Sequence, residues 1–100
     1  MDQGDDPTVS DIRAKITAAD EQLVALVNSR IELVAGLHAH KREHGYSTVD
    51  PDRERRLLEH LEATSDGPIS VDGLKQLYAT VIALCTAEAR RVNDNSRGSQ

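Results

Sequence analysis

The sequence predicts an all-α fold of three helices in the order long, short, long, from which two chains build an intertwined homodimer. Apolar residues recur at helical spacing, and no segment alternates apolar and polar residues between hairpin turns. The chain has 100 residues, which suits a single domain. Its hydrophobic residues make up 38% of the total but include only two aromatic ones, both Tyr, so aliphatic side chains must build the core.

The first predicted helix runs from about Asp11 to about Glu43, with Ser10 as its N-cap. At about 1.5 Å per residue it is roughly 50 Å long, whereas a compact domain of this size has a radius of gyration of about 13 Å. The helix therefore extends beyond the core of its own chain, and a second chain must cover its apolar stripe. The stripe consists of Ile12, Ile16, Ala19, Leu23, Leu26, Val34 and Leu37.

The second helix is short and the third is long. Asp50 and Pro51 supply an N-cap and the residue best tolerated at the first helical position, and the turn residues 64–68 end this helix. Ser70 caps the third helix, whose wide apolar face indicates burial. That face contains Leu74, Leu77, Tyr78, Val81, Ile82, Leu84 and Cys85. We expect the helical domain at residues 9–92, between disordered polar tails at 1–8 and 93–100.

Charge and cysteine usage exclude several classes of protein. The net charge of -5 argues against a nucleic-acid partner. No apolar run approaches the roughly 20 residues that cross a bilayer, and the N-terminus lacks the pattern of a secretion signal, so we expect no membrane partner. Cys85 is the single cysteine, which excludes an intrachain disulfide and favours a reducing, cytoplasmic location.

Two cations interrupt the apolar stripe of the first helix, where charges need partners. Arg30 follows Leu26 by one turn, and Lys41 follows Leu37 by one turn. Their Cα atoms are about 16 Å apart on one face, so the two long side chains can converge. An isolated cation of this kind is more often a snorkelling side chain, and the charged run 52–56 by itself indicates a solvated helix face.

The sequence contains few residues that would support metal binding, phosphate binding or nucleophilic catalysis. His40 and His44 have the spacing of two metal ligands on a helix, but we expect no carboxylate or Cys to complete the set, and therefore no metal site. There is no Gly-rich phosphate loop, and Cys85 lies in an apolar stripe without a neighbouring base, which favours packing over nucleophilic catalysis.

Several segments match one family in order and interval. They are Ile12-Arg13-Ala14-Lys15-Ile16, Ala19-Asp20-Glu21-Gln22-Leu23, Asn28-Ser29-Arg30, Lys41 and Asp50-Pro51-Asp52-Arg53-Glu54-Arg55. Through them the chain resembles the all-helical chorismate mutases of the AroQ class, from about Val9 to Arg91. The resemblance implies conversion of chorismate, a small dicarboxylate, to prephenate without a cofactor. Because the reaction is pericyclic, the protein supplies conformer selection and positive charge rather than an acid, base or nucleophile.

The same resemblance implies roles for individual residues. Arg13, Arg30 and Arg53 would hold the substrate carboxylates. Lys41 would contact the breaking ether oxygen, and Glu54 and the backbone of Asp50 would receive the ring hydroxyl. Lys41, Arg30 and Glu54 are thus the expected catalytic residues.

The third helix departs from the family pattern, and the first helix requires a partner chain. The family commonly places a Ser and, four residues later, a Gln or Glu on the ether oxygen, and we assign Cys85 and Ala89 to those positions. Lys41 would then act there alone or with a water. Arg13 and Arg30 are about 25 Å apart along one helix, so both can serve one substrate only if Arg13 comes from the partner chain.

Three functions stay open at this point. The first is chorismate mutation in phenylalanine and tyrosine synthesis, with regulation by another enzyme of the aromatic pathway undetermined. The second uses the same pocket on 4-amino-4-deoxychorismate, or eliminates pyruvate from isochorismate as a related helical lyase does. The third is a non-catalytic helical dimerisation module, which the apolar stripe alone would suit.

Overall fold

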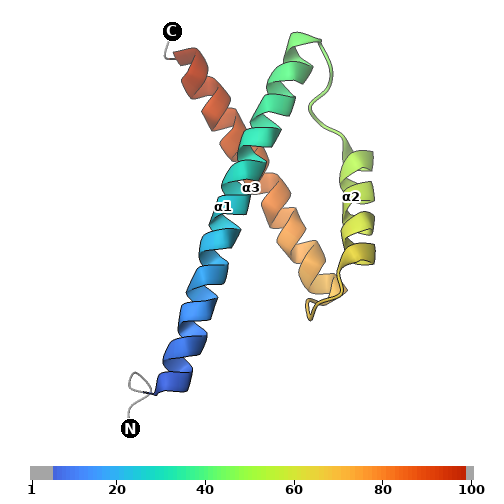
Figure 1. Cartoon of the computed structure of the whole chain (residues 1–100). Coiled ribbons are helices and arrows are strands. Elements are labelled where there is room, and N and C mark those ends of the chain that lie inside the picture. The colour runs from blue at the N-terminus through green and yellow to red at the C-terminus, as the bar shows by residue number, and fades with distance from the viewer. Residues whose placement is uncertain (1–5, 99–100) are drawn as a thin grey trace. The chain divides into compact units, whose positions relative to one another are not determined.

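The computed structural model describes residues 6–98, and within this range it contains three helices and no strand (Figure 1). They are α1 (Pro7–Glu43), α2 (Pro51–Thr64) and α3 (Val71–Gly98), which confirms the all-α fold in the predicted order. No helix of the described range is long and apolar enough to span a membrane. The chain divides into two compact units, Met1–Arg30 and Ile31–Gln100.

Helix α1 begins earlier than the sequence pattern predicted. Asp6 caps it in place of Ser10: the Asp6 carboxylate accepts the Thr8 N–H at 2.9 Å, and the Asp6 carbonyl accepts the Ser10 N–H at 3.0 Å. Pro7 takes the first helical position, where its missing N–H costs nothing. The predicted N-terminal tail is therefore too long by Pro7 and Thr8, and residues 1–5 lie outside the described residues.

In the first unit, the apolar stripe of α1 has little cover. Ile12, Ile16, Leu23 and Leu26 are between 52% and 68% exposed. Exposed aliphatic side chains in a row along one helix are typical of a surface that packs against another protein. The prediction that a second copy of this chain covers them stays a prediction.

Helix α1 ends in a cap that requires glycine. Gly45 has a φ of 69°, in the left-handed region that other residues enter at a cost. Its N–H donates to the Arg42 carbonyl at 3.2 Å, and the Tyr46 N–H donates to the Lys41 carbonyl at 2.7 Å. These two bonds form a Schellman motif, which satisfies carbonyls at the helix end and turns the chain sharply.

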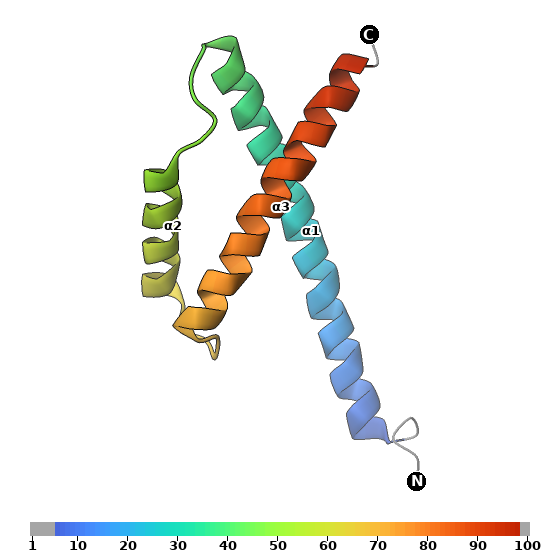
Figure 2. The same ribbon diagram turned by 180° about the vertical axis from the view of Figure 1, so that it is seen from behind.

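Local capping also fixes the ends of α2 and α3, as predicted. The Asp50 side chain accepts the Arg53 N–H at 3.0 Å, with Pro51 in the first turn of α2. The Ser70 hydroxyl accepts the Gly73 N–H at 3.0 Å and so caps α3. Figures 1 and 2, which view the molecule from opposite sides, both show α2 beside the first half of α3.

The buried residues of the second unit include Leu74 and, where α3 meets the second half of α1, small side chains. Cys85 and Ala89 have no exposed surface, and Ala35 of α1 is 5% exposed. One α3 turn beyond Ala89, the Asn93 amide donates to the Ala35 carbonyl at 3.2 Å. This bond identifies the face of α3 that packs on α1. Cys85 is a free, buried thiol.

Helix α3 continues past Val92, where the predicted domain ended, as far as Gly98. The predicted disordered tail is thus helical in its first part, because Asn93 is held by α1 and the residues after it extend a helix that has already formed. Gln100 and Ser99 lie outside the described residues.

Candidate active site

A pocket of about 130 Å³ lies where all three helices of the second unit contribute side chains. The end of α1, the loop before α2, the first turn of α2 and the middle of α3 each supply part of its wall. Its lining residues are His38, Arg42, Thr48, Val49, Glu54, Thr86 and Arg90. We call it the Glu54 pocket.

A groove of about 470 Å³ adjoins this pocket and shares Glu54, Thr86 and Arg90 with it. The rest of the groove is apolar and comes from α3: Ala79, Ile82, Ala83 and Ala87. An apolar wall that ends in a few polar groups is typical of a small-molecule site, and the volume lies within the usual range. The two hollows together suit a small ligand with a carbon ring and charged substituents.

Positive charge dominates around the Glu54 pocket. The pKa of His38 is lowered by its partial burial and, to a smaller extent, by the charges of Lys41, Arg42 and Arg90. Between residues 6 and 96 ion pairs join only Asp52 to Arg55 and Glu88 to Arg91, so these three cations are not neutralised by a carboxylate. Arg42 and Arg90 line the pocket with the single carboxylate of Glu54, and Lys41, which does not line the pocket, adds positive charge near His38. The excess of positive charge favours an anionic ligand.

Four of the predicted site residues lie in the second unit, on or next to the segments that line the Glu54 pocket. Glu54 lines both hollows. Lys41 is half-buried in the last turns of α1 and acts electrostatically on His38. Asp50 caps α2, and Arg53 projects an exposed side chain from the first turn of that helix. The other two arginines belong to the first unit, where Arg13 is exposed and Arg30 is half-buried.

The two α3 residues assigned to the site, Cys85 and Ala89, are in the packed core instead. Neither has exposed surface, and neither lines a described pocket. Thr86 and Arg90 follow them by one position each, and both line the Glu54 pocket and the groove. One residue along a helix turns a side chain by about 100°, which separates the core face from the pocket face.

A signal for this register was present in the sequence. Residues spaced three or four apart along α3 form one buried or half-buried stripe: Leu74, Tyr78, Val81, Cys85, Ala89 and Val92. Cys85 and Ala89 are in phase with this stripe, whereas Thr86 and Arg90 are beside it. The sequence did not predict His38 and Arg42 as site residues, because the cation in phase with the apolar stripe of α1 is Lys41.

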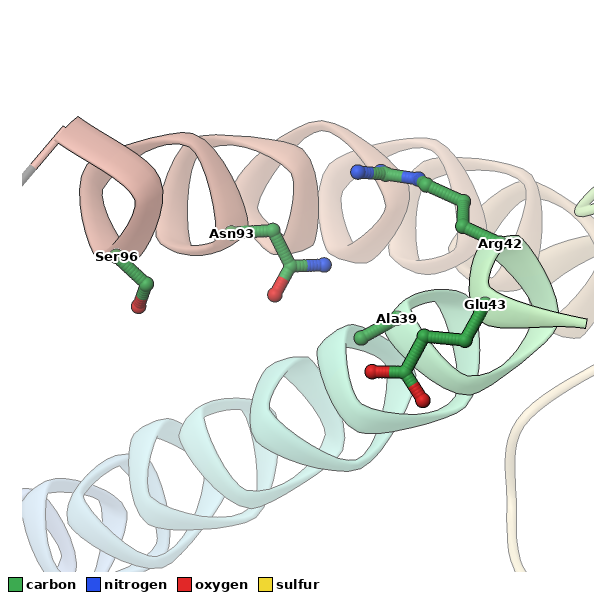
Figure 3. Close-up of a pocket in the computed structure, with 5 residues that line it drawn as sticks. All are labelled: Ala39, Arg42, Glu43, Asn93 and Ser96. Atoms are coloured by element: carbon green, nitrogen blue, oxygen red, sulfur yellow. The ribbon is translucent and has the colours of Figure 1, made fainter. Parts of the chain in front are cut away.

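A second pocket, of about 360 Å³, lies between the last turns of α1 and the end of α3 (Figure 3). Ala39, Arg42 and Glu43 line it from α1, and Asn93 and Ser96 line it from α3. The Asn93 amide is engaged with the Ala35 carbonyl. The charged side chains that line this pocket are those of Arg42 and Glu43.

One group in the described residues has the composition of a metal site. His40, Glu43 and His44 each offer a ligand atom, and these atoms lie within 4.8 Å of one another. The prediction that no carboxylate accompanies the two histidines is wrong, because Glu43 lies beside them. All three side chains are exposed.

The family model for chorismate mutase type II matches residues 12–90. The match covers α2 and most of α1 and α3, and so includes every residue that lines the Glu54 pocket. The chain therefore belongs to the chorismate mutase type II family. The comparison with individual curated proteins gives no significant match.

The lowered pKa of His38 predicts how stability depends on pH. Unfolding exposes the partly buried His38 to water, separates it from Lys41, Arg42 and Arg90, and returns its pKa toward 6.5, so below that pH the unfolded state binds more protons. The histidine's contribution to stability is complete above pH 6.5 and is lost as pH falls toward the folded pKa. Denaturant unfolding at several pH values should show a shallower acid decline for His38→Gln than for the wild type. The variant retains Glu54, the titratable carboxylate that lines this pocket, so the two proteins differ only at position 38. Equal declines would contradict this assignment.

Proposed function

We propose that this protein converts chorismate to prephenate. The observation that carries the proposal is the set of three cations without carboxylate partners around a pocket that contains Glu54, in a chain of the chorismate mutase type II family. Chorismate carries two carboxylates, so the excess of positive charge favours its binding. The apolar wall of the groove suits its ring.

The proposed mechanism needs no proton transfer or covalent intermediate. The cations draw the two carboxylates together and select the compact conformer in which the new C–C bond can form. Lys41 donates to the ether oxygen, on which negative charge grows as the C–O bond breaks. Glu54 accepts a hydrogen bond from the ring hydroxyl and fixes the ring relative to the enolpyruvyl side chain.

We assign the α3 contribution to Thr86 and Arg90. They keep the four-residue spacing that the family resemblance implies for a hydroxyl residue and its partner, and they line the pocket with Glu54. Thr86 supplies the hydroxyl. Arg90 supplies a guanidinium in place of an amide or carboxyl group, and its planar donors suit either a carboxylate or the ether oxygen.

The proposed active form is a homodimer in which the apolar residues of α1 are covered by a second chain. Their exposure in the first unit supports this arrangement. Along α1, Arg13 is about 25 Å from Arg30 at about 1.5 Å per residue, too far for both to reach one small ligand. Arg13 of the partner chain therefore completes each site, together with Arg30 and Arg53.

Purified protein should consume chorismate and form prephenate, and Lys41→Ala should lower kcat by about 100- to 1000-fold, as loss of one preorganised donor typically does. Lys75→Ala, which removes an exposed lysine of α3, is the matched control and should leave kcat unchanged. Chorismate loss and prephenate formation are followed spectroscopically.

The same assay with isochorismate and 4-amino-4-deoxychorismate identifies the preferred substrate. Faster turnover of either one would replace chorismate in the proposal. No turnover of any of the three at high protein concentration would support the non-catalytic helical module.

Replacement of Arg90 tests the α3 assignment. Arg90→Ala should lower kcat/KM by about 10- to 100-fold, the typical effect of losing a hydrogen bond to a charged group. Arg90→Gln retains a donor and should lose less. The control is Arg91→Ala, because the adjacent Arg91 pairs with Glu88 at 2.6 Å and lines neither hollow. Equal effects at the two positions would refute the assignment.

Subunit mixing tests whether Arg13 crosses to the partner. Arg13→Ala and Lys41→Ala homodimers should both be nearly inactive, but a heterodimer keeps one intact site if Arg13 serves the other chain. Random reassembly of equal amounts should therefore restore about one quarter of wild-type activity. As a control, Lys41→Ala mixed with Glu54→Gln should restore none, since both residues serve the site of their own chain. Failure of the first mixture to recover would contradict the shared site.

A further inference from the structure

We propose that His40, Glu43 and His44 form a zinc-binding site at the C-terminal end of α1. Two imidazoles and one carboxylate are a ligand set that proteins use for zinc with an open fourth position for water. The three ligand atoms lie within 4.8 Å of one another. The site is separate from the Glu54 pocket, whose lining includes none of these residues.

The spacing of the three residues places them on one end of the helix. His40 and His44 are one helical turn apart, and their ring centroids are 4.2 Å apart. Glu43 lies between them in sequence, so the segment has the order H-x-x-E-H, in which the two histidines of one class of zinc peptidases bind the metal. Figure 3 shows the Glu43 carboxylate turned away from the Arg42 guanidinium, so the neighbouring cation does not occupy it.

One hydrogen bond prepares His44 for coordination. Its Nδ1 lies 2.9 Å from the His40 carbonyl oxygen, which can accept only if Nδ1 carries the proton. The lone pair of His44 is then on Nε2. Zinc-binding histidines commonly donate their second ring nitrogen to a backbone carbonyl in this way, which orients the ring and selects the tautomer.

The backbone beneath the site is held by the Schellman motif at Gly45 and Tyr46. His44 is the last residue before Gly45, and the His44 ring also stacks on Tyr46 with centroids 5.5 Å apart. Tetrahedral zinc needs donor atoms roughly 3.3 Å apart. Exposed side chains on a fixed backbone can close that gap by rotating about their side-chain bonds.

The electrostatic setting favours zinc over magnesium or calcium. The dipole of α1 places partial negative charge at its C-terminal end, which favours a cation, but Lys41 and Arg42 in the same turn oppose a site that relies on charge alone. Imidazole ligands bind zinc through nitrogen, whereas magnesium and calcium prefer several oxygen ligands. Because Lys41 and Arg42 belong to this turn, bound zinc would also stiffen the backbone that carries them.

Zinc titration of the full chain against a chromogenic chelator tests the proposal. We expect one ion per chain, and at least about a tenfold weaker affinity in His40→Ala and in His44→Ala. His60→Ala, which removes an exposed histidine of α2, is the matched control and should bind as the wild type does. Unchanged affinity in the double variant His40→Ala/His44→Ala, or an equal loss in His60→Ala, would overturn the site.

A stability measurement gives a second readout that does not depend on enzyme activity. Zinc should raise the Tm of the wild type and of His60→Ala, because a ligand of the folded state stabilises it. It should leave the Tm of the double variant unchanged, and magnesium should shift none of them. Circular dichroism should show that each variant retains its helices. A zinc-dependent shift that persists in the helical double variant would also overturn the proposal.

Discussion

The close contact between the end of α1 and the middle of α3 is the constraint on which the rest of the second unit depends. Ala35, Cys85 and Ala89 have almost no exposed surface, and the Asn93 amide donates to the Ala35 carbonyl. Helix pairs lie about 8–10 Å apart according to the side chains between them. A larger residue at this contact would separate the helices and widen the Glu54 pocket, whose walls come from the same two helices.

This contact also explains why the pocket is positively charged. Thr86 and Arg90 are each one residue beyond a core position, so the packing that buries Cys85 and Ala89 turns them toward the pocket, where α1 presents His38 and Arg42. Like charges held close together destabilise a fold unless a ligand compensates them. In the proposed function a bound dianion would offset this repulsion, which is a common compromise between stability and activity.

The sequence predicted those features that depend on neighbours along the chain. The caps of α2 and α3 were predicted because Asp50, Pro51 and Ser70 act within one turn. The register of the α3 site residues was not, because a four-residue spacing fits both the pair Cys85/Ala89 and the pair Thr86/Arg90. The apolar stripe of α3 indicates that Cys85 and Ala89 belong to the core, but only the packing against α1 shows which groups face Thr86 and Arg90.

The start of α1 and the group at its end were missed for a related reason. Apolar periodicity begins at Ile12, so it does not indicate that Asp6 and Pro7 already form the first turn. Likewise, two histidines one turn apart indicate a ligand pair, but whether Glu43 joins them depends on how the last turn of the helix is closed by Gly45. Both features are decided by the geometry of helix ends, to which periodicity is insensitive.

The proposed dimer would meet two requirements with one symmetry operation. The first unit exposes aliphatic side chains whose burial would stabilise the fold by about 25 cal/mol for each Å² removed from water. Separately, the proposed site uses Arg13, which on the same α1 lies too far from Arg30 to reach one ligand with it. In a two-fold dimer the same surface is used by both chains, so the packing that covers the stripe of one α1 also brings its Arg13 to the site of the other. Folding and catalysis would then depend on the same interface.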